Sequence, residues 1–268
     1  MKKFSLFLLS FTCIALISSS CQKQKPFTPL FNGENLENWD IFLGSSLGTD
    51  FDSLARAATS ETVFSVVEDN GQKIIRISGE INGSLASRES FENYHLRLVF
   101  RWGDKVYSSR NSGLLYHSFG DFGVAFGTWM TNIECQLMHE NLGDTYLMMN
   151  TTCESAAAKD ENSKDFVYSP GADLVPFGKH EGTPMIRKIY DNEKSLGEWN
   201  TVDLYCFGAT SVHVVNGVTM VVNKNTGTFE EGVIKPLTSG KIQLQSEGGE
   251  LFIKTIEIQP ITKLPKGL

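Results

Sequence analysis

The feature that most constrains this fold is an alternation of apolar and polar residues with a period of two. It is clearest between residues 94 and 102, where Tyr94, Leu96, Leu98, Phe100 and Trp102 alternate with His95, Arg97, Val99 and Arg101. Because successive side chains of a strand point to opposite faces of a sheet, this run predicts an antiparallel strand with one buried face. Similar runs recur along the chain between turn signals such as Asn216-Gly217. With no long helical period, they predict an all-β fold, a two-sheet antiparallel sandwich.

The N-terminal segment reads as an export signal and lies outside the predicted sandwich. Lys2 and Lys3 precede an apolar run over residues 4–17, which is too short to span a bilayer, and three serines then lead to Cys21. A cysteine in this place resembles a bacterial lipoprotein signal, which implies cleavage before Cys21 and lipidation of its thiol. The protein would then be anchored to a membrane on the periplasmic side or the cell surface. An ordinary secretory signal cut nearby is the alternative.

The predicted domain organisation is a signal peptide over 1–20, a tether over 21–28 and one β-sandwich domain over 29–262. The formal net charge is −7, and no basic stripe is present, which argues against nucleic acid as a partner. The predicted domain contains three cysteines, Cys135, Cys153 and Cys206. Their odd number argues against a disulfide framework, and their spacing does not match that of zinc ligands. Cys135 and Cys206 are predicted core residues, and a Cys153–Cys206 bridge stays open.

The stretch from residue 132 to 148 carries the candidate chemistry. As a strand it places Ile133, Cys135 and Leu137 on one face and Asn132, Glu134 and Gln136 on the other. A carboxylate flanked by two amides is costly in a half-buried sheet unless a polar partner lies against it. A sugar would be such a partner, and an ordinary solvent-facing strand is the alternative. Residues 154–165, further along, are predicted to be loop-like or helical.

Seven landmarks in order resemble the 3-keto-disaccharide hydrolase family. They are LFNGENLENW at 30–39, YHLRLVFRWG at 94–103, NSGLLYH at 111–117, NIECQLMHENLGDTY at 132–146, GEWN at 197–200, VNG at 215–217 and GKIQLQSEGGELF at 240–252. The resemblance implies a jelly-roll sandwich of the concanavalin A-like lectin/glucanase type. It also implies a hydrolase that acts on glycosides whose sugar is oxidised to a ketone at carbon 3.

A ketone at carbon 3 acidifies the hydrogen on carbon 2, so a base can start an elimination that expels the group on carbon 1. Water can then add. This route needs a base, an acid for the leaving group and a donor for the enolate oxygen. Glu134 is the predicted base, with a salt bridge to a nearby Arg as the alternative role. His117 is a candidate acid or base because histidine titrates near neutral pH. Arg110 and Asn111 are candidate donors to sugar hydroxyls or the enolate.

Further residues complete the predicted carbohydrate site. Trp129 and Tyr146 offer aromatic faces to a sugar ring, with core packing as the alternative. Gln136 faces the same side as Glu134, His139 follows the strand, and Glu247 is a second carboxylate and a rival for the acid role. Asp144 is either a turn former or a ligand. No cofactor is predicted, and a bound cation such as calcium is left open.

Two other functions compete with this hydrolase. A two-carboxylate glycosidase resembling laminarinases would carry acids spaced as ExDxxE on one strand, and this spacing does not occur. A lipid-anchored carbohydrate-binding protein without turnover would show aromatic residues along a shallow groove and no acid or base directed into it.

Overall fold

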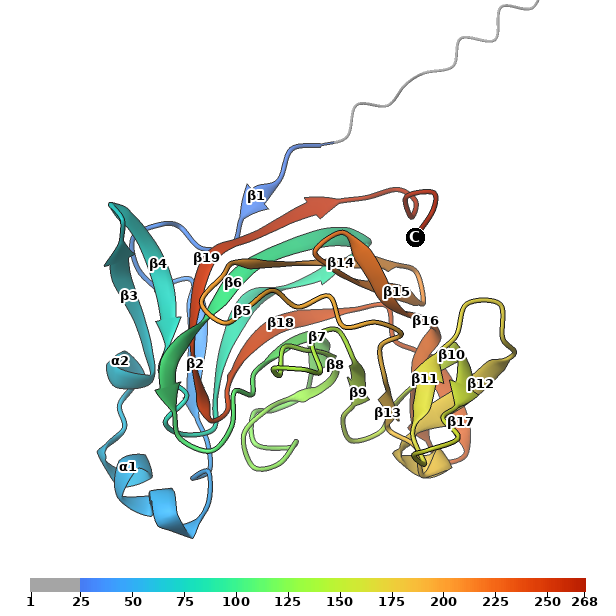
Figure 1. Cartoon of the computed structure of the whole chain (residues 1–268), viewed down its shortest axis with the longest axis horizontal. Coiled ribbons are helices and arrows are strands. Elements are labelled where there is room, and N and C mark those ends of the chain that lie inside the picture. Colours follow the sequence, from blue (N-terminus) through green and yellow to red (C-terminus); the bar gives the residue numbers. More distant parts are fainter. Residues whose placement is uncertain (1–24) are drawn as a thin grey trace, which may run out of the picture.

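The computed structural model describes residues 25–268. The predicted signal peptide over 1–20 and the predicted lipidation site Cys21 lie outside the described residues. Within 25–268 the strands form two sheets, and every strand pair in the ladders is antiparallel. In Figure 1 the strands β14, β6 and β19 form the upper layer, and β18, β7 and β8 lie beneath them. The predicted all-β, two-sheet sandwich is confirmed.

The larger sheet of the described chain has twelve strands. Nine follow the order β11-β10-β16-β15-β14-β6-β19-β4-β3, and the other three, β1, β12 and β17, pair with β19, β10 and β16. Its strands are β1 Thr28–Pro29, β3 Phe64–Asp69, β4 Gln72–Ile77, β6 Tyr94–Val106, β10 Thr151–Lys159, β11 Phe166–Tyr168, β12 Leu174–Gly178, β14 Asn200–Phe207, β15 Thr210–Val215, β16 Val218–Glu230, β17 Val233–Pro236 and β19 Gly249–Pro260. The smaller sheet runs β13-β9-β8-β7-β18-β5-β2. Its strands are β2 Trp39–Leu43, β5 Gly83–Glu92, β7 Gly113–Phe119, β8 Thr131–Gln136, β9 Thr145–Leu147, β13 Met185–Ile186 and β18 Ser239–Ser246.

The core lies between the sheets and is built from the apolar positions of the alternating runs. Leu96, Leu98 and Phe100 of β6 are fully buried there. Cys135, Cys153 and Cys206 are free and buried. Cys135 and Cys206 are therefore core residues as predicted, and the bridge between Cys153 and Cys206 is not formed.

Residues 154–165 differ from the prediction, because their first half continues strand β10 rather than forming a loop or helix. Pairing of β10 with β11, β12 and β16 supplies its backbone hydrogen bonds. These neighbours override the helical preference of the alanines at 156–158, since propensity is weaker than tertiary pairing.

Short helices account for the remaining regular structure of the described chain. They are η1 Thr49–Phe51, α1 Asp52–Ala57, α2 Ser60–Val63 and η2 Lys179–Glu181. A capping box between Thr59 and Thr62 starts α2. No helix within 25–268 has the length and apolarity needed to cross a membrane.

Candidate functional site

Strand β8 positions the central residue of the site. Ile133 and Cys135 are buried in the core between the sheets, and Glu134 and Gln136 line a pocket on the opposite face. This is the parity that alternation predicts, since one residue along a strand reverses the side-chain direction. The partition of this stretch into a core face and a polar face is therefore confirmed.

The pocket has a volume of about 300 Å³ and brings together residues that are far apart in sequence. Six of the predicted site residues line it, namely Asn111, Trp129, Glu134, Gln136, Tyr146 and Glu247. Asn82, Phe126 and Met148 also line it and were not predicted. The volume and the mixture of aromatic, amide and carboxyl groups suit a small polar ligand with an apolar face.

Glu134 is a carboxyl group held in an environment that disfavours its charge. Only 3% of the residue is exposed, and its Oε1 has no hydrogen-bond partner within residues 25–268. No ion pair between Glu134 and an arginine exists in this part of the chain, so the alternative structural role is absent there. Burial raises the pKa of Glu134 well above its usual value, and the negative charges of Glu247 and Asp144 raise it further.

Glu247 is the second carboxyl group of the pocket and follows the end of β18. Burial raises its pKa from 4.5 to about 7. Its charge acts on Glu134, so the two groups resist simultaneous ionisation. Two carboxyls that resist simultaneous ionisation share one proton, so the pair can offer a base and an acid at the same time.

A glycine keeps the approach to Glu134 open. Gly113 of β7 pairs with Gln136 of β8, and a Cβ built on Gly113 would lie 2.3 Å from Glu134 Oε1. The same Cβ would lie 2.5 Å from Oε1 of Gln245, which belongs to β18. Any larger residue at 113 would displace one or both of these side chains.

The aromatic residues of the pocket have different roles. Trp129 is only 2% exposed, and its indole Nε1 donates a hydrogen bond to the carbonyl of Gly83. It packs with Leu115 and Met148 and builds the apolar part of the floor. Phe126 is 53% exposed at the rim, with the Lys179 ammonium 5.1 Å from its ring centroid. Phe126 has a left-handed φ of 50°, an uncommon conformation for a bulky residue that is found at functional sites.

His117 corrects the sequence-based assignment, because the structure does not bring it to the pocket. The register of β7 shifts between Tyr116 and Phe119, and His117 has a φ of 50°. This bulge breaks the alternation that the assignment assumed. The imidazole is buried against the rings of Tyr94 and Tyr116, and burial lowers its pKa to about 4. A neutral, enclosed His117 cannot protonate a leaving group in this pocket.

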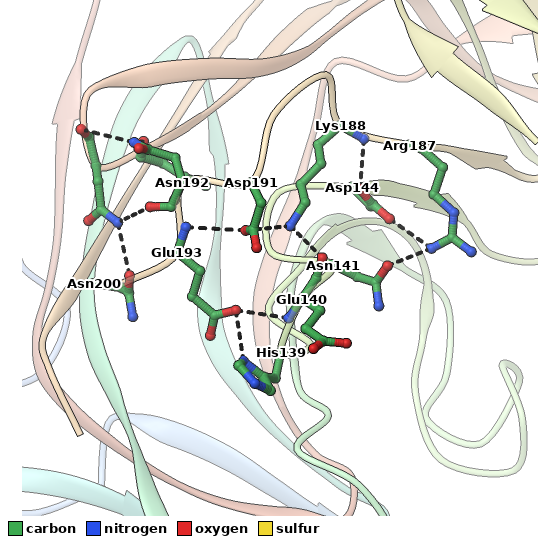
Figure 2. Close-up of polar contacts among 12 residues, drawn as sticks. His139, Glu140, Asn141, Asp144, Arg187, Lys188, Asp191, Asn192, Glu193 and Asn200 are labelled. Carbon is green, nitrogen blue, oxygen red and sulfur yellow. Dashed lines mark hydrogen bonds and ion pairs between the residues drawn. The ribbon is translucent and has the colours of Figure 1, made fainter. Parts of the chain in front are cut away.

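Arg110 and His139 also lie outside the pocket lining. The backbone N–H of His139 donates to the carbonyl of Arg110, which holds the two residues beside each other behind the Asn111 turn. Nδ1 of His139 lies 2.9 Å from Glu193 Oε2. His139 is thus paired with Glu193, as Figure 2 shows, and does not take part in the pocket around Glu134.

The polar network in Figure 2 secures the loop after β8. Asp144 accepts hydrogen bonds from Arg187 Nη1 at 2.9 Å and from the backbone N–H of Lys188 at 2.7 Å. The same Arg187 nitrogen donates to Asn141. Asp144 is therefore an ion-pairing residue that fixes the loop between β8 and β9, and it acts on Glu134 only through its charge.

A larger cavity, of about 570 Å³, is lined by residues of β1, β5 and the C-terminal end of β19. Its two carboxyl residues, Glu89 and Glu92, are exposed, so this cavity holds no buried acid or base. Within residues 25–268 no cluster of three or more His, Cys, Asp or Glu side chains could hold a metal ion. The smaller pocket around Glu134 is the better candidate site.

Comparison with known proteins places this geometry in a family context. The model of a 3-keto-alpha-glucoside-1,2-lyase-like domain matches residues 26–259. A crystal structure of a candidate glycosyl hydrolase from Parabacteroides distasonis is 18% identical, with a TM-score of 0.50, over 88% of this chain and 100% of that one. A second such structure from the same organism is also 18% identical, with a TM-score of 0.48, over 88% and 94%.

A carbohydrate-binding module, CBM66 from Bacillus subtilis, is 9% identical, with a TM-score of 0.43, over 73% of this chain and 91% of that one. No curated protein matches the sequence. At these identities the first of the three structures supports the sandwich fold and nothing finer.

Proposed function

Because the chain belongs to the 3-keto-alpha-glucoside-1,2-lyase-like family, we propose that it cleaves the glycosidic bond of 3-keto-glucosides, including 3-keto-disaccharides. The proposed route is elimination across carbons 1 and 2, followed by addition of water. Membership of the family supports a role in carbohydrate chemistry, and the reaction and its residues are inferred from the pocket.

The observation that carries the proposal is Glu134, a buried carboxyl group with an unpartnered oxygen inside a sugar-sized pocket. A carboxylate with a raised pKa is a stronger base than one in water. Leaving such a group unsatisfied is destabilising unless a ligand uses it. The second carboxyl, Glu247, lies in the same pocket and supplies the acid that the reaction needs.

The proposed reaction has two stages, elimination and hydration. Glu134 takes the hydrogen from carbon 2, the C1–C2 double bond forms, and the C1–O bond to the leaving group breaks. Glu247 gives its proton to the departing oxygen. Water then enters and adds across the double bond. Its oxygen bonds to carbon 1, its proton passes to Glu247, and Glu134, whose acidic proton exchanges with the entering water, returns a proton to carbon 2. The net result is hydrolysis to 3-keto-glucose and an alcohol.

The enolate oxygen needs hydrogen-bond donors, and amides of the pocket can supply them. Oε1 of Gln136 accepts the backbone N–H of Met138 at 3.2 Å, which leaves the amide NH₂ of Gln136 free to donate. Asn111 lines the same pocket from the turn before β7. These neutral donors stabilise the developing charge without pairing with Glu134 beforehand.

The test of the proposal is the release of 3-keto-glucose from 3-keto-trehalose or a 3-keto-glucoside by the pure protein. Release that depends on Glu134 supports the enzyme. Binding of sugars without release by the wild type would instead support a carbohydrate-binding protein without turnover. Two carboxyl groups lining the pocket speak against that alternative, which predicts no acid or base directed into the groove.

Phe126 is expected to contribute binding rather than chemistry. Replacing Phe126 by Ala should raise KM about tenfold and leave kcat nearly unchanged, because an exposed ring at the rim contacts substrate and transition state alike. Steady-state kinetics on a 3-keto-glucoside measure this effect. Val124→Ala is the matched control, since Val124 is exposed in the same loop but does not line the pocket. An equal effect of both substitutions would argue for a change in the loop rather than lost contact.

We also propose that the protein is held at a bacterial membrane by lipid on Cys21, facing the periplasm or the exterior. The support is the order of basic, apolar and small residues before that cysteine. In a bacterial host, Cys21→Ala should move the protein from the membrane fraction to the soluble fraction. Retention of the variant in the membrane fraction would contradict lipid anchoring at this residue.

A further inference from the structure

Gln245 is a buried amide without a partner. It lies on β18, is 1% exposed, and neither its Oε1 nor its Nε2 has a hydrogen bond within residues 25–268. Buried side-chain amides are almost always satisfied, because an unpaired polar group loses its water without compensation. An unpaired buried amide beside a proposed catalytic carboxyl therefore suggests a function for Gln245.

The side chains of Gln245 and Glu134 both approach the position that a Cβ on Gly113 would take, and no hydrogen bond joins them in this structure. The site that a Cβ of Gly113 would fill lies 2.3 Å from Glu134 Oε1 and 2.5 Å from Gln245 Oε1. The carboxyl arrives from β8 and the amide from β18, on either side of β7. Gln245 does not line the pocket itself. It is buried on the same face of the sheet as Glu134 and would act through that residue.

Two other glutamines on this face are already engaged. Oε1 of Gln243 accepts from Ser84 Oγ at 2.8 Å and from the backbone N–H of Met130 at 3.3 Å. Oε1 of Gln136 accepts from Met138. Of these three amides, Gln245 is the one with both ends free, so its amide can present either the oxygen or the NH₂ to a neighbour.

We propose that Gln245 is a positioning residue for Glu134, whose amide donates Nε2–H to the ionised carboxylate and, when turned over, accepts the O–H of the protonated acid. The inference rests on the proposed function, because a base that takes and returns a proton needs a partner able to match both forms. A carboxylate or an ammonium at 245 would match only one of them.

The test is an NMR titration of the Glu134 carboxyl carbon, assigned by its absence in Glu134→Gln, in the wild type and in Gln245→Met. Hydrogen bonds to ionised groups are stronger than those to neutral groups, so losing the amide removes more stabilisation from the carboxylate. The midpoint should therefore rise by about one pH unit in Gln245→Met. The other charges that act on Glu134, those of Glu247 and Asp144, are unchanged in this variant.

Gln243→Met is the matched control, because it removes an amide from the same strand and face whose oxygen is bound to Ser84 and Met130. It should leave the midpoint of Glu134 within a few tenths of a unit of the wild type, whatever it does to stability. Thermal melting checks folding, and Gln245→Asn, which keeps an amide but withdraws it by one methylene, should give the same upward shift. If neither Gln245 variant moves the midpoint, the proposal is overturned.

Kinetics separate this inference from the proposed function. In Gln245→Met the acid limb of the kcat–pH profile should move upward with the midpoint while KM stays unchanged. If the Glu134 midpoint is shifted in the Gln245 variants but the wild type does not cleave 3-keto-glucosides, the Gln245–Glu134 interaction is supported and the proposed function is rejected. Cleavage by the wild type with an unmoved midpoint in both variants would keep the function and reject the contact.

Discussion

Replacing Glu134 by Gln is expected to lower kcat for 3-keto-glucose release about 10³-fold, because general bases contribute roughly 10² to 10⁴ in rate. Gln has nearly the same size but cannot take the hydrogen from carbon 2. Substrate should still bind, since the pocket lining is otherwise intact. Release of 3-keto-glucose from a 3-keto-glucoside at saturating substrate measures the effect.

Stability supplies a second readout for the same variant. Glu134 is buried beside two other negative charges, so Glu134→Gln should fold and should melt at or above the wild-type temperature. Glu68→Gln is the control for the chemical change, because Glu68 is an exposed carboxylate on β3 of the opposite sheet. Equal release by wild type and Glu134→Gln would remove Glu134 from the mechanism.

Glu247→Gln should have the second largest effect, and its size should depend on the leaving group. With a sugar or alkyl leaving group, kcat should fall about 10²-fold, because the departing oxygen loses its proton donor. With a nitrophenyl 3-keto-glucoside the loss should be slight, since nitrophenol can leave as its anion. Comparison of kcat for the two substrates in wild type and variant measures this difference.

The pH dependence of kcat provides a second, independent test of the role of Glu247. The active form of the coupled pair carries one proton, on Glu247, so wild-type kcat should decline at alkaline pH as the pair loses that proton. That alkaline limb should disappear in Glu247→Gln. A limb that persists unchanged in the variant, or an equal loss with both leaving groups, would assign the proton donor elsewhere.

The parts of the site that lie on regular strands were predictable from the sequence. A strand fixes side-chain direction by parity, so the polar face of residues 132–136 followed from the apolar positions between them. The resemblance to a known family then connected this strand with the turn at Asn111 and the end of β18 at Glu247. For that reason most of the predicted residues meet in one pocket.

The remaining differences arise where the backbone leaves regular geometry or where a contact depends on register between distant strands. The bulge in β7 turns His117 into the core, which no count of alternating residues reveals. Phe126 reaches the rim from an irregular loop with positive φ. The position of Gln245 near Glu134 depends on the sheet order, which places β18 and β8 on either side of Gly113, and this order could not be predicted from the sequence.

The central claim is that cleavage begins with removal of the hydrogen on carbon 2, and the fate of that hydrogen tests it most directly. The pure protein is given a 3-keto-glucoside in deuterated water, and the earliest 3-keto-glucose formed is analysed for deuterium at carbon 2, with unlabelled 3-keto-glucose incubated alongside to measure spontaneous exchange. Elimination followed by hydration predicts deuterium at carbon 2 well above that control, and no such product from Glu134→Gln. Product that retains the original hydrogen at carbon 2, formed at an unchanged rate from a substrate deuterated at that carbon, would contradict the account, because it would show that the glycosidic bond is broken without removal of that hydrogen.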